Sequence, residues 1–96
     1  MNTDFDAIAI AEEDNVATAL RDIAPGNPVR VRLTDGVRVV HVVESVALCH
    51  KLSIVRIAAG ESVVKYGEEI GAARENIEAG QHVHIHNLAS RRGSAR

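Results

Sequence analysis

One short pattern occurs three times in this chain: an isoleucine, a glycine three residues later, and a valine three residues after the glycine. The copies span residues 23–29, 57–63 and 77–83. Glycine reaches the positive φ that many tight turns require, so each copy predicts a strand, a tight turn and a second strand. The isoleucine and the valine would anchor each turn in an apolar core. A chain punctuated in this way favours short β-strands over long helices.

The most secure local element lies between the first two copies. Apolar and polar residues alternate over 29–33, Asp35-Gly36 is a strong hairpin signal, and a valine-rich strand returns over 37–46. Short strands separated by glycine turns, with little helical periodicity, predict an all-β fold from which this hairpin projects.

The remaining segments are less distinctive. Another strand is expected over 50–57, whereas residues 16–20 are compatible with a strand or a short helix. The apolar patch at 7–11 is compatible with a short strand or the first turn of a helix. Pro25 and Pro28 end whichever element residues 16–20 form.

Ninety-six residues are enough for one domain. We expect residues 12–89 to form a single β domain, with residues 1–11 as an N-terminal extension. Residues 90–96 are small, polar and basic, and are expected to be a disordered tail. A domain of this size buries a modest fraction of its surface and gains stability from a partner.

The composition excludes several classes of function. The formal net charge is −2 at pH 7, which argues against general nucleic-acid binding because phosphates require a dense cationic surface. No apolar run is long enough to span a membrane, and the N-terminus lacks the basic start of a secretory signal. Cys49 is the only cysteine, so no internal disulfide can form. These features predict a cytoplasmic protein that acts without nucleic acid or membrane.

Three histidines follow the third turn at alternate positions: His82, His84 and His86. A strand here would place the three imidazoles on one face and bury Val83 and Ile85 on the other. Same-face neighbours lie about 7 Å apart, so two imidazoles could bind one metal ion with a third ligand from elsewhere. The alternative is an exposed, histidine-rich edge strand without a ligand.

Two further polar clusters are candidates for binding. His50 and Lys51 are adjacent, and Lys65 and Tyr66 precede a glycine. A lysine ammonium and a tyrosine hydroxyl both donate hydrogen bonds to a carboxylate, so the second cluster could line an anion pocket. Alternatively, Lys65 extends into water from a strand end and Tyr66 fills a boundary position. The sequence leaves both interpretations open.

Several motifs, taken in order, resemble one known family. They are the segment 14–26, His50-Lys51, the segment 65–71 that begins Lys-Tyr-Gly, and the segment 77–87 that ends His-Val-His-Ile-His-Asn. Together they resemble the N-terminal domain of altronate and galactarate dehydratases, and the small alpha subunit of sulfolactate sulfo-lyase. The resemblance covers roughly residues 12–88.

This resemblance implies a SAF-type domain with a β-clip fold. It also implies lyase chemistry on sugar acids or related hydroxy acids, and the dehydratases of the family are iron-dependent. The residues that match the motifs are then the candidate site: His50, Lys51, Lys65, Tyr66 and Asn87 for substrate, and His82, His84 and His86 for metal.

The large catalytic region of the dehydratases is absent from this sequence. We therefore expect the small subunit of a two-component carbon–oxygen or carbon–sulfur lyase, with a large catalytic subunit as partner and a small carboxylate as substrate. Iron usually also takes acidic ligands, so Fe²⁺ or another divalent metal would be shared with that partner. The alternative is a stand-alone carboxylate- or metal-binding module without turnover. Exposed strand edges further predict a homo-oligomer in isolation.

Overall fold

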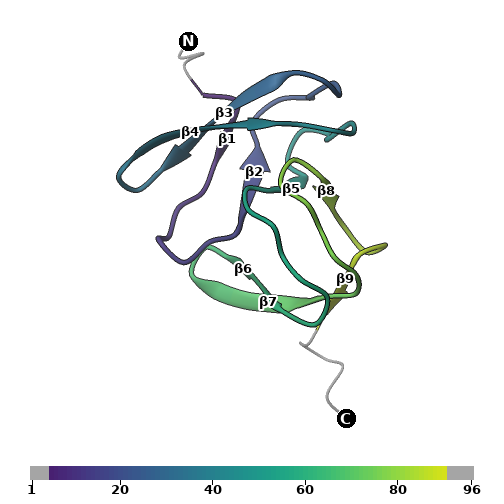
Figure 1. The fold of residues 1–96 in the computed structure, drawn as a ribbon. Helices are drawn as coiled ribbons and strands as arrows, with labels where there is room; N and C mark the ends of the chain where they lie inside the picture. The colour runs from purple at the N-terminus through teal and green to yellow at the C-terminus, as the bar shows by residue number, and fades with distance from the viewer. Residues whose placement is uncertain (1–4, 91–96) are drawn as a thin grey trace.

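The computed structural model describes residues 5–90 and shows a chain built from strands, turns and loops (Figure 1). Residues 5–90 contain no helix, which confirms the all-β class. These residues therefore include no helix that could cross a membrane. The strands are β1 (Ala7–Ile8), β2 (Val16–Ala19), β3 (Pro28–Leu33), β4 (Gly36–His41), β5 (Lys51–Ser53), β6 (Ser62–Lys65), β7 (Glu68–Ala73), β8 (His82–Val83) and β9 (Leu88–Ser90).

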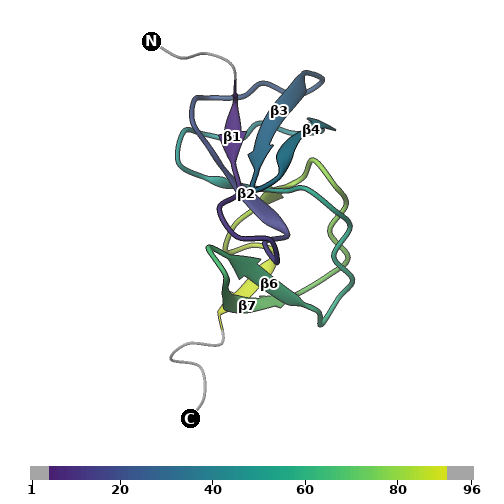
Figure 2. The ribbon, with the colours of Figure 1, turned by 90° about the vertical axis from the view of Figure 1, so that its left-hand side faces the viewer.

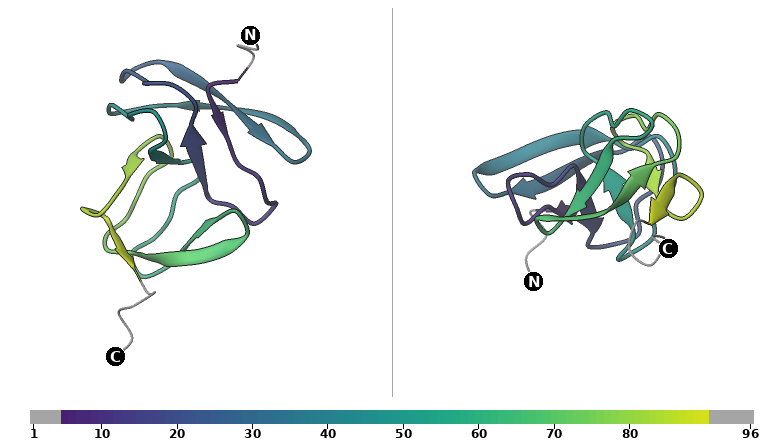
Figure 3. Two further views of the ribbon diagram at one scale, coloured as in Figure 1. Left: turned by 180° about the vertical axis from the view of Figure 1, so that it is seen from behind. Right: turned by 90° about the horizontal axis from the view of Figure 1, so that it is seen from below.

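The strands form two sheets, one above the other in Figures 1 and 2. The larger sheet has the order β4-β3-β1-β2-β5-β8, and the smaller has the order β6-β7-β9. The β3–β4 hairpin projects beyond the rest of the fold (Figure 3), with Leu33 opposite Gly36. β4 ends at His41, short of the expected Val46, because the Val43 N–H bonds to the Gly80 carbonyl in another segment.

The segments near the N-terminus are strands. β1 lies between β3 and β2 in the larger sheet, and β2 pairs with β5. Residues 7 and 8 of the expected extension 1–11 are therefore part of the sheet. At the other end Ser90 closes β9, and the remainder of the expected tail, from residue 91, lies outside the described residues.

The three glycine turns occur where the repeated pattern predicts them. Gly26, Gly60 and Gly80 have φ values of 86°, 86° and 93°. A fourth turn of the same form spans residues 46–52, where Cys49, with a φ of 73°, takes the place of the glycine. In all four turns, the residue at the glycine position donates its backbone N–H to a distant carbonyl: Gly26 to Val42, Cys49 to Ala19, Gly60 to Ala73 and Gly80 to Ser53.

The four turns divide the chain into two halves with the same order of elements. Ile23 bridges to Val46 in the first half, as Ile57 bridges to Ile77 in the second. The first and last residues of every turn pattern are buried, so the repeat also sets the core. Each half contains a turn, a hairpin and a second turn: 23–29, β3–β4 and 46–52, then 57–63, β6–β7 and 77–83.

Replacing Cys49 with glycine should raise the free energy of unfolding by about 1 kcal/mol. A residue with a Cβ is strained at this positive φ, and glycine removes the strain. Cys49 is exposed, so little apolar burial is lost. Cys49→Ala keeps the Cβ and should remain close to the parent protein. Urea unfolding of the three proteins measures the difference, and equal stability of the glycine and alanine variants would contradict it.

Asp14 and Asn15 join the two sheets. The Asp14 carboxylate accepts the N–H groups of Ile10 and Ala11 at 3.0 Å each, and the N–H of Gly67, in the β6–β7 turn, at 2.8 Å. Asn15 then bonds to the backbone of β6 through both ends of its amide. One dipeptide therefore holds the smaller sheet against the loop that precedes β2.

Asp14 should make the stability of the protein sensitive to acid. Burial alone would raise the pKa of its carboxyl, but the backbone N–H groups outweigh burial and leave the pKa below its ordinary value. A pKa that is lower in the folded state stabilises the fold above the unfolded value of about 3.9. That contribution disappears as the pH falls through the folded pKa.

The variant Asp14→Asn should therefore lose about 2 kcal/mol at pH 7, because its NH₂ group cannot accept these hydrogen bonds. It should also lose stability less steeply in acid than the parent protein does. Asp35→Asn, at the exposed tip of the β3–β4 hairpin, is the control and should unfold as the parent does. Urea unfolding at neutral and acidic pH tests both, and an unchanged acid slope in Asp14→Asn would refute the assignment.

Candidate metal and anion site

The histidine segment is not one straight strand. β8 ends after two residues, and a turn connects it to β9. Asn87 holds this turn, because its Oδ1 accepts the His84 N–H at 2.9 Å and its Nδ2 donates to the His82 carbonyl at 2.8 Å. Val83 is buried as predicted. The prediction for Ile85 is wrong, since the turn leaves that side chain 74% exposed.

Three imidazoles meet where β5 pairs with β8. His50 immediately precedes β5, His82 lies in β8 opposite Leu52, and His84 follows β8. The ring centroids are 4.8–5.3 Å apart and the rings are stacked, with interplanar angles of 13–20°. His50 Nδ1 lies 2.9 Å from His82 Nε2. One nitrogen from each ring lies within 4.8 Å of the other two, and we call these residues the histidine trio.

The trio differs from the metal set expected from the sequence. His50, which the resemblance assigned to substrate, belongs to the trio, whereas His86 does not. The His86 ring is tilted, lies 5.6 Å from the His82 ring and is exposed. Alternation along one strand could not reveal the role of His50, because 32 residues separate it from His82.

The surroundings of His82 and His84 favour the neutral imidazole. Partial burial lowers the pKa of His82, and the neighbouring histidines lower it further. The pKa of His84 is also lowered, first by loss of water contact and then by His50, Lys51 and His86. A neutral imidazole has a free lone pair, which is the form that binds a metal ion.

The donor set of the trio fits a divalent transition metal. Imidazole nitrogens bind Zn²⁺, Fe²⁺ and similar ions, and three such ligands leave coordination positions open for water, an acid or a further side chain. Within the described residues 5–90, this group of possible ligands consists of the three imidazoles and includes neither a carboxylate nor a thiolate. His50, His82 and His84 are thus the residues that would hold the ion.

A family model described as the altronate/galactarate dehydratase SAF domain matches residues 5–91. The chain belongs to this family. Altronate dehydratases of Escherichia coli strain K12 and Bacillus subtilis strain 168 are 46% and 39% identical to it over 80 residues. Those residues are 83% of this SAF domain but 15% of either dehydratase, so the chain spans a small part of the relatives that it matches.

A second kind of relative has a length closer to that of this chain. The (2R)-sulfolactate sulfo-lyase subunit alpha of Chromohalobacter salexigens is 39% identical over 49 residues. The match covers 51% of this SAF domain and 52% of that subunit. The relatives of this chain therefore include both long polypeptides and a protein named as a subunit.

The SAF domain places its only two lysines beside the trio. Lys51 lies opposite Thr18 in the β2–β5 pair, and burial followed by the charge of Lys65 lowers the pKa of Lys51. The Lys65 Nζ lies 4.8 Å from the ring centroid of Tyr66, whose hydroxyl is 3.1 Å from the Thr18 hydroxyl. The charge of Lys51 also lowers the pKa of His84, so Lys51 lies near the trio at that residue. Lys51 pairs with Val83 and His82 pairs with Leu52, so the side chains of Lys51 and His82 leave the sheet on opposite faces.

The structure gives Asn87 and Thr18 positions that the sequence did not predict. Asn87 is fully buried and both ends of its amide bond to backbone, so it shapes the turn that carries His84. Thr18 was not expected at the site, because a threonine in a strand gives no signal in the sequence until its hydroxyl is seen beside Tyr66.

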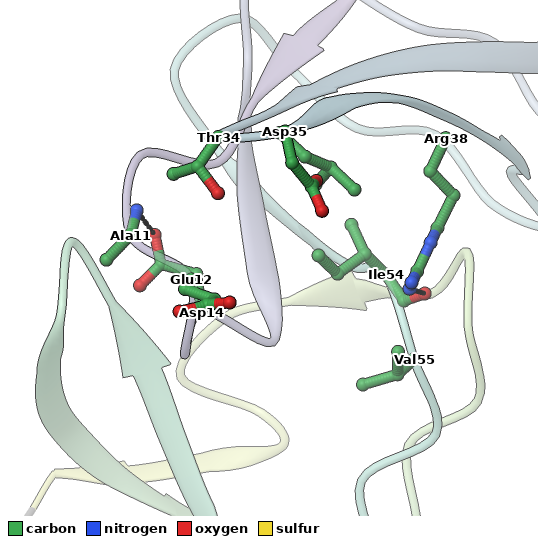
Figure 4. A pocket seen from close by; sticks show the side chains of 9 residues that line it. Ala11, Glu12, Asp14, Thr34, Asp35, Arg38, Ile54 and Val55 are labelled. Carbon is green, nitrogen blue, oxygen red and sulfur yellow. Dashed lines mark hydrogen bonds between the residues drawn. The ribbon is translucent and has the colours of Figure 1, made fainter.

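A separate cavity of about 280 Å³ lies beside the β3–β4 hairpin (Figure 4). Asp35 and Arg38 of the hairpin, Glu12 and Ile54 are among its lining residues. Neither the trio nor the lysine pair lines this cavity. The histidine and lysine candidates from the family motifs therefore lie outside this cavity, whereas Asp14 of the motif segment 14–26 lines it.

Proposed function

We propose that this SAF domain is the small, metal- and acid-binding subunit of a two-component lyase that acts with a large catalytic subunit on sugar acids or related hydroxy acids. The observation that carries the proposal is that the pairing of β5 with β8 brings His50, His82 and His84 together and sets Lys51 near His84. The names of the relatives support elimination from carbon–oxygen or carbon–sulfur bonds.

The trio and the lysine pair would have different tasks. The ammonium groups of Lys51 and Lys65 and the hydroxyl of Tyr66 would hold the substrate carboxylate by charge-assisted hydrogen bonds. Fe²⁺ or another divalent metal on His50, His82 and His84 would act there as a Lewis acid. Asn87 would fix the position of His84 through the turn.

The large subunit would supply the rest of the chemistry. Elimination β to a carboxylate needs a base for the α-proton and an acid for the leaving group. In this proposal the imidazoles hold the metal and the lysines hold the substrate carboxylate, and the Glu44 carboxylate beside them accepts the His82 backbone N–H, so none of these groups is assigned as the acid or the base. We therefore assign the missing acid and base, and further metal ligands, to the partner.

Acid binding tests the role of the lysine pair. Calorimetric titration with altronate, galactarate and (2R)-sulfolactate should find one acid that binds, and Lys51→Met or Lys65→Met should weaken it roughly tenfold or more. Arg32→Met removes an exposed cation from β3 and is the matched control, which should bind as the parent does. An equal loss in the control, or no binding of any acid with or without divalent metal, would reject the proposal.

Turnover separates the proposal from its alternative, a stand-alone binding module. The purified chain should bind the acid without eliminating a leaving group, and elimination should require a large subunit. Elimination by the chain alone would show that no partner is needed. Tight acid binding, with no large subunit recovered from its native source in complex with the chain, would favour the module.

A further inference from the structure

Side chains cap the outer edges of two strands in this fold. Asn15 accepts the Val64 N–H at 2.8 Å and donates to the Ser62 carbonyl at 2.9 Å, which closes the edge of β6. On β8, the Glu44 carboxylate accepts the His82 N–H at 2.9 Å. Capped edges of this kind cannot accept a strand from another chain.

β4, the end strand of the larger sheet, has a free edge along its first part. Arg30, which lies opposite Val39, turns both its N–H and its carbonyl toward Asp6 on the β1 side. This cross-strand pair therefore exchanges no hydrogen bonds, and the backbone groups of Val39 and Val37 point away from the sheet. Within residues 5–90 these outward N–H and carbonyl groups have no partner.

Two valines along this edge are exposed, and Arg38 between them, whose side chain alternates to the other face, donates to the Ile54 carbonyl. Val37 and Val39 are 46% and 55% exposed on the outer face of the hairpin. The arginines opposite them on β3, Arg32 and Arg30, stack on Phe5, with guanidinium carbons 5.3 and 6.0 Å from its ring centroid. Phe5 precedes β1, so these charges are held on the side of β3 away from the free edge.

We propose that two copies of this domain pair edge to edge through β4, in an antiparallel two-fold arrangement. Val37 and Val39 of one copy would then meet the same segment of the other, so that the outward N–H and carbonyl groups satisfy one another and the valines form one apolar stripe. The projection of the hairpin leaves space for the second copy to approach (Figure 3). The contact ends before Val43, whose N–H already bonds to Gly80.

This pairing does not depend on the proposed lyase function. It also specifies the second copy as the occupant, because an antiparallel edge with alternating free donors and acceptors is complementary to itself. The six-stranded sheet would continue across the two-fold axis. The histidine trio, at the β5–β8 end of the same sheet, would lie at the two outer ends of the dimer.

Sedimentation velocity over a wide range of protein concentration tests the proposal. The parent protein should form a dimer, and Val39→Lys and Val39→Pro should each weaken dimerisation about tenfold or more. The proline removes only an outward N–H, which an edge strand tolerates. Val55→Lys introduces the same charge at an exposed valine outside β4 and should dimerise as the parent does.

Amide hydrogen exchange adds a readout at single residues. The Val37 and Val39 amides should become protected as the protein concentration rises, whereas the Arg38 amide, which bonds to β3, should be protected throughout. A parent protein that stays monomeric, a folded Val39 variant that dimerises normally, or a Val55→Lys variant that dissociates would each overturn the proposal. Circular dichroism identifies any variant that fails to fold. If one Val39 variant does not fold, the dimerisation of the other Val39 variant tests the proposal.

Discussion

Replacing Gly80 with alanine is expected to prevent stable folding. The residue has a φ of 93°, and a Cβ there would overlap the carbonyl oxygen of His41 and lie 3.0 Å from its carbonyl carbon and 3.3 Å from the Val42 Cα. All three are backbone atoms, so the clash cannot be relieved by a change of rotamer. We expect a loss of about 4 kcal/mol or more, which is a large part of the stability of a domain of this size.

Gly60→Ala is the matched control for this effect. Gly60 occupies the same place in the repeated turn and has a φ of 86°, but no atom lies within 4 Å of a Cβ built on it. Only the backbone strain should remain, at about 1 kcal/mol. Urea unfolding followed by circular dichroism compares the two variants. Similar losses would contradict the close packing of the 77–83 turn against the end of β4.

Loss of an imidazole from the trio is expected to weaken the binding of Zn²⁺ by about a hundredfold or more. Changes to groups that merely orient a ligand already lower metal affinity about 10- to 100-fold, and His50→Ala or His84→Ala removes a ligand itself. His86→Ala should have a smaller effect, because the His86 ring is tilted and exposed at the edge of the group. Isothermal titration calorimetry with Zn²⁺ measures these affinities.

His41→Ala provides the control for these variants. His41 is exposed at the end of β4 and belongs to no group of metal-binding side chains in residues 5–90. Its replacement should leave Zn²⁺ affinity unchanged. Wild-type affinity in His50→Ala, or an equal loss in His41→Ala, would show that the trio is not the binding site.

The strands and turns follow from local signals in the sequence. The all-β class, the Asp35-Gly36 hairpin and three of the turns depend on glycine and on apolar alternation within a few residues. The fourth turn escaped notice because Cys49 stands where the pattern requires glycine, and only the backbone angle shows the equivalence. A non-glycine residue at positive φ leaves no signal in the residue pattern.

The candidate site was predictable in part. The motifs singled out residues that do lie near one another: His50, His82 and His84 form the trio, Lys51 lies near His84, and Lys65 lies beside Tyr66. The geometry of the site was not predictable, because His50 reaches the other imidazoles only through the pairing of β5 with β8. The break after Val83 was missed because a side-chain amide holds it, and such local hydrogen bonds compete with strand pairing.

The measurement that tests this account most directly is NMR of the five histidine side chains during titration with Zn²⁺. The account predicts that the imidazole signals of His50, His82 and His84 shift together and saturate at one equivalent of metal. His86 should respond less, and His41 should not respond. If no imidazole responds, or if His41 shifts in parallel with the trio, the central claim that these three histidines form one ligand site is contradicted.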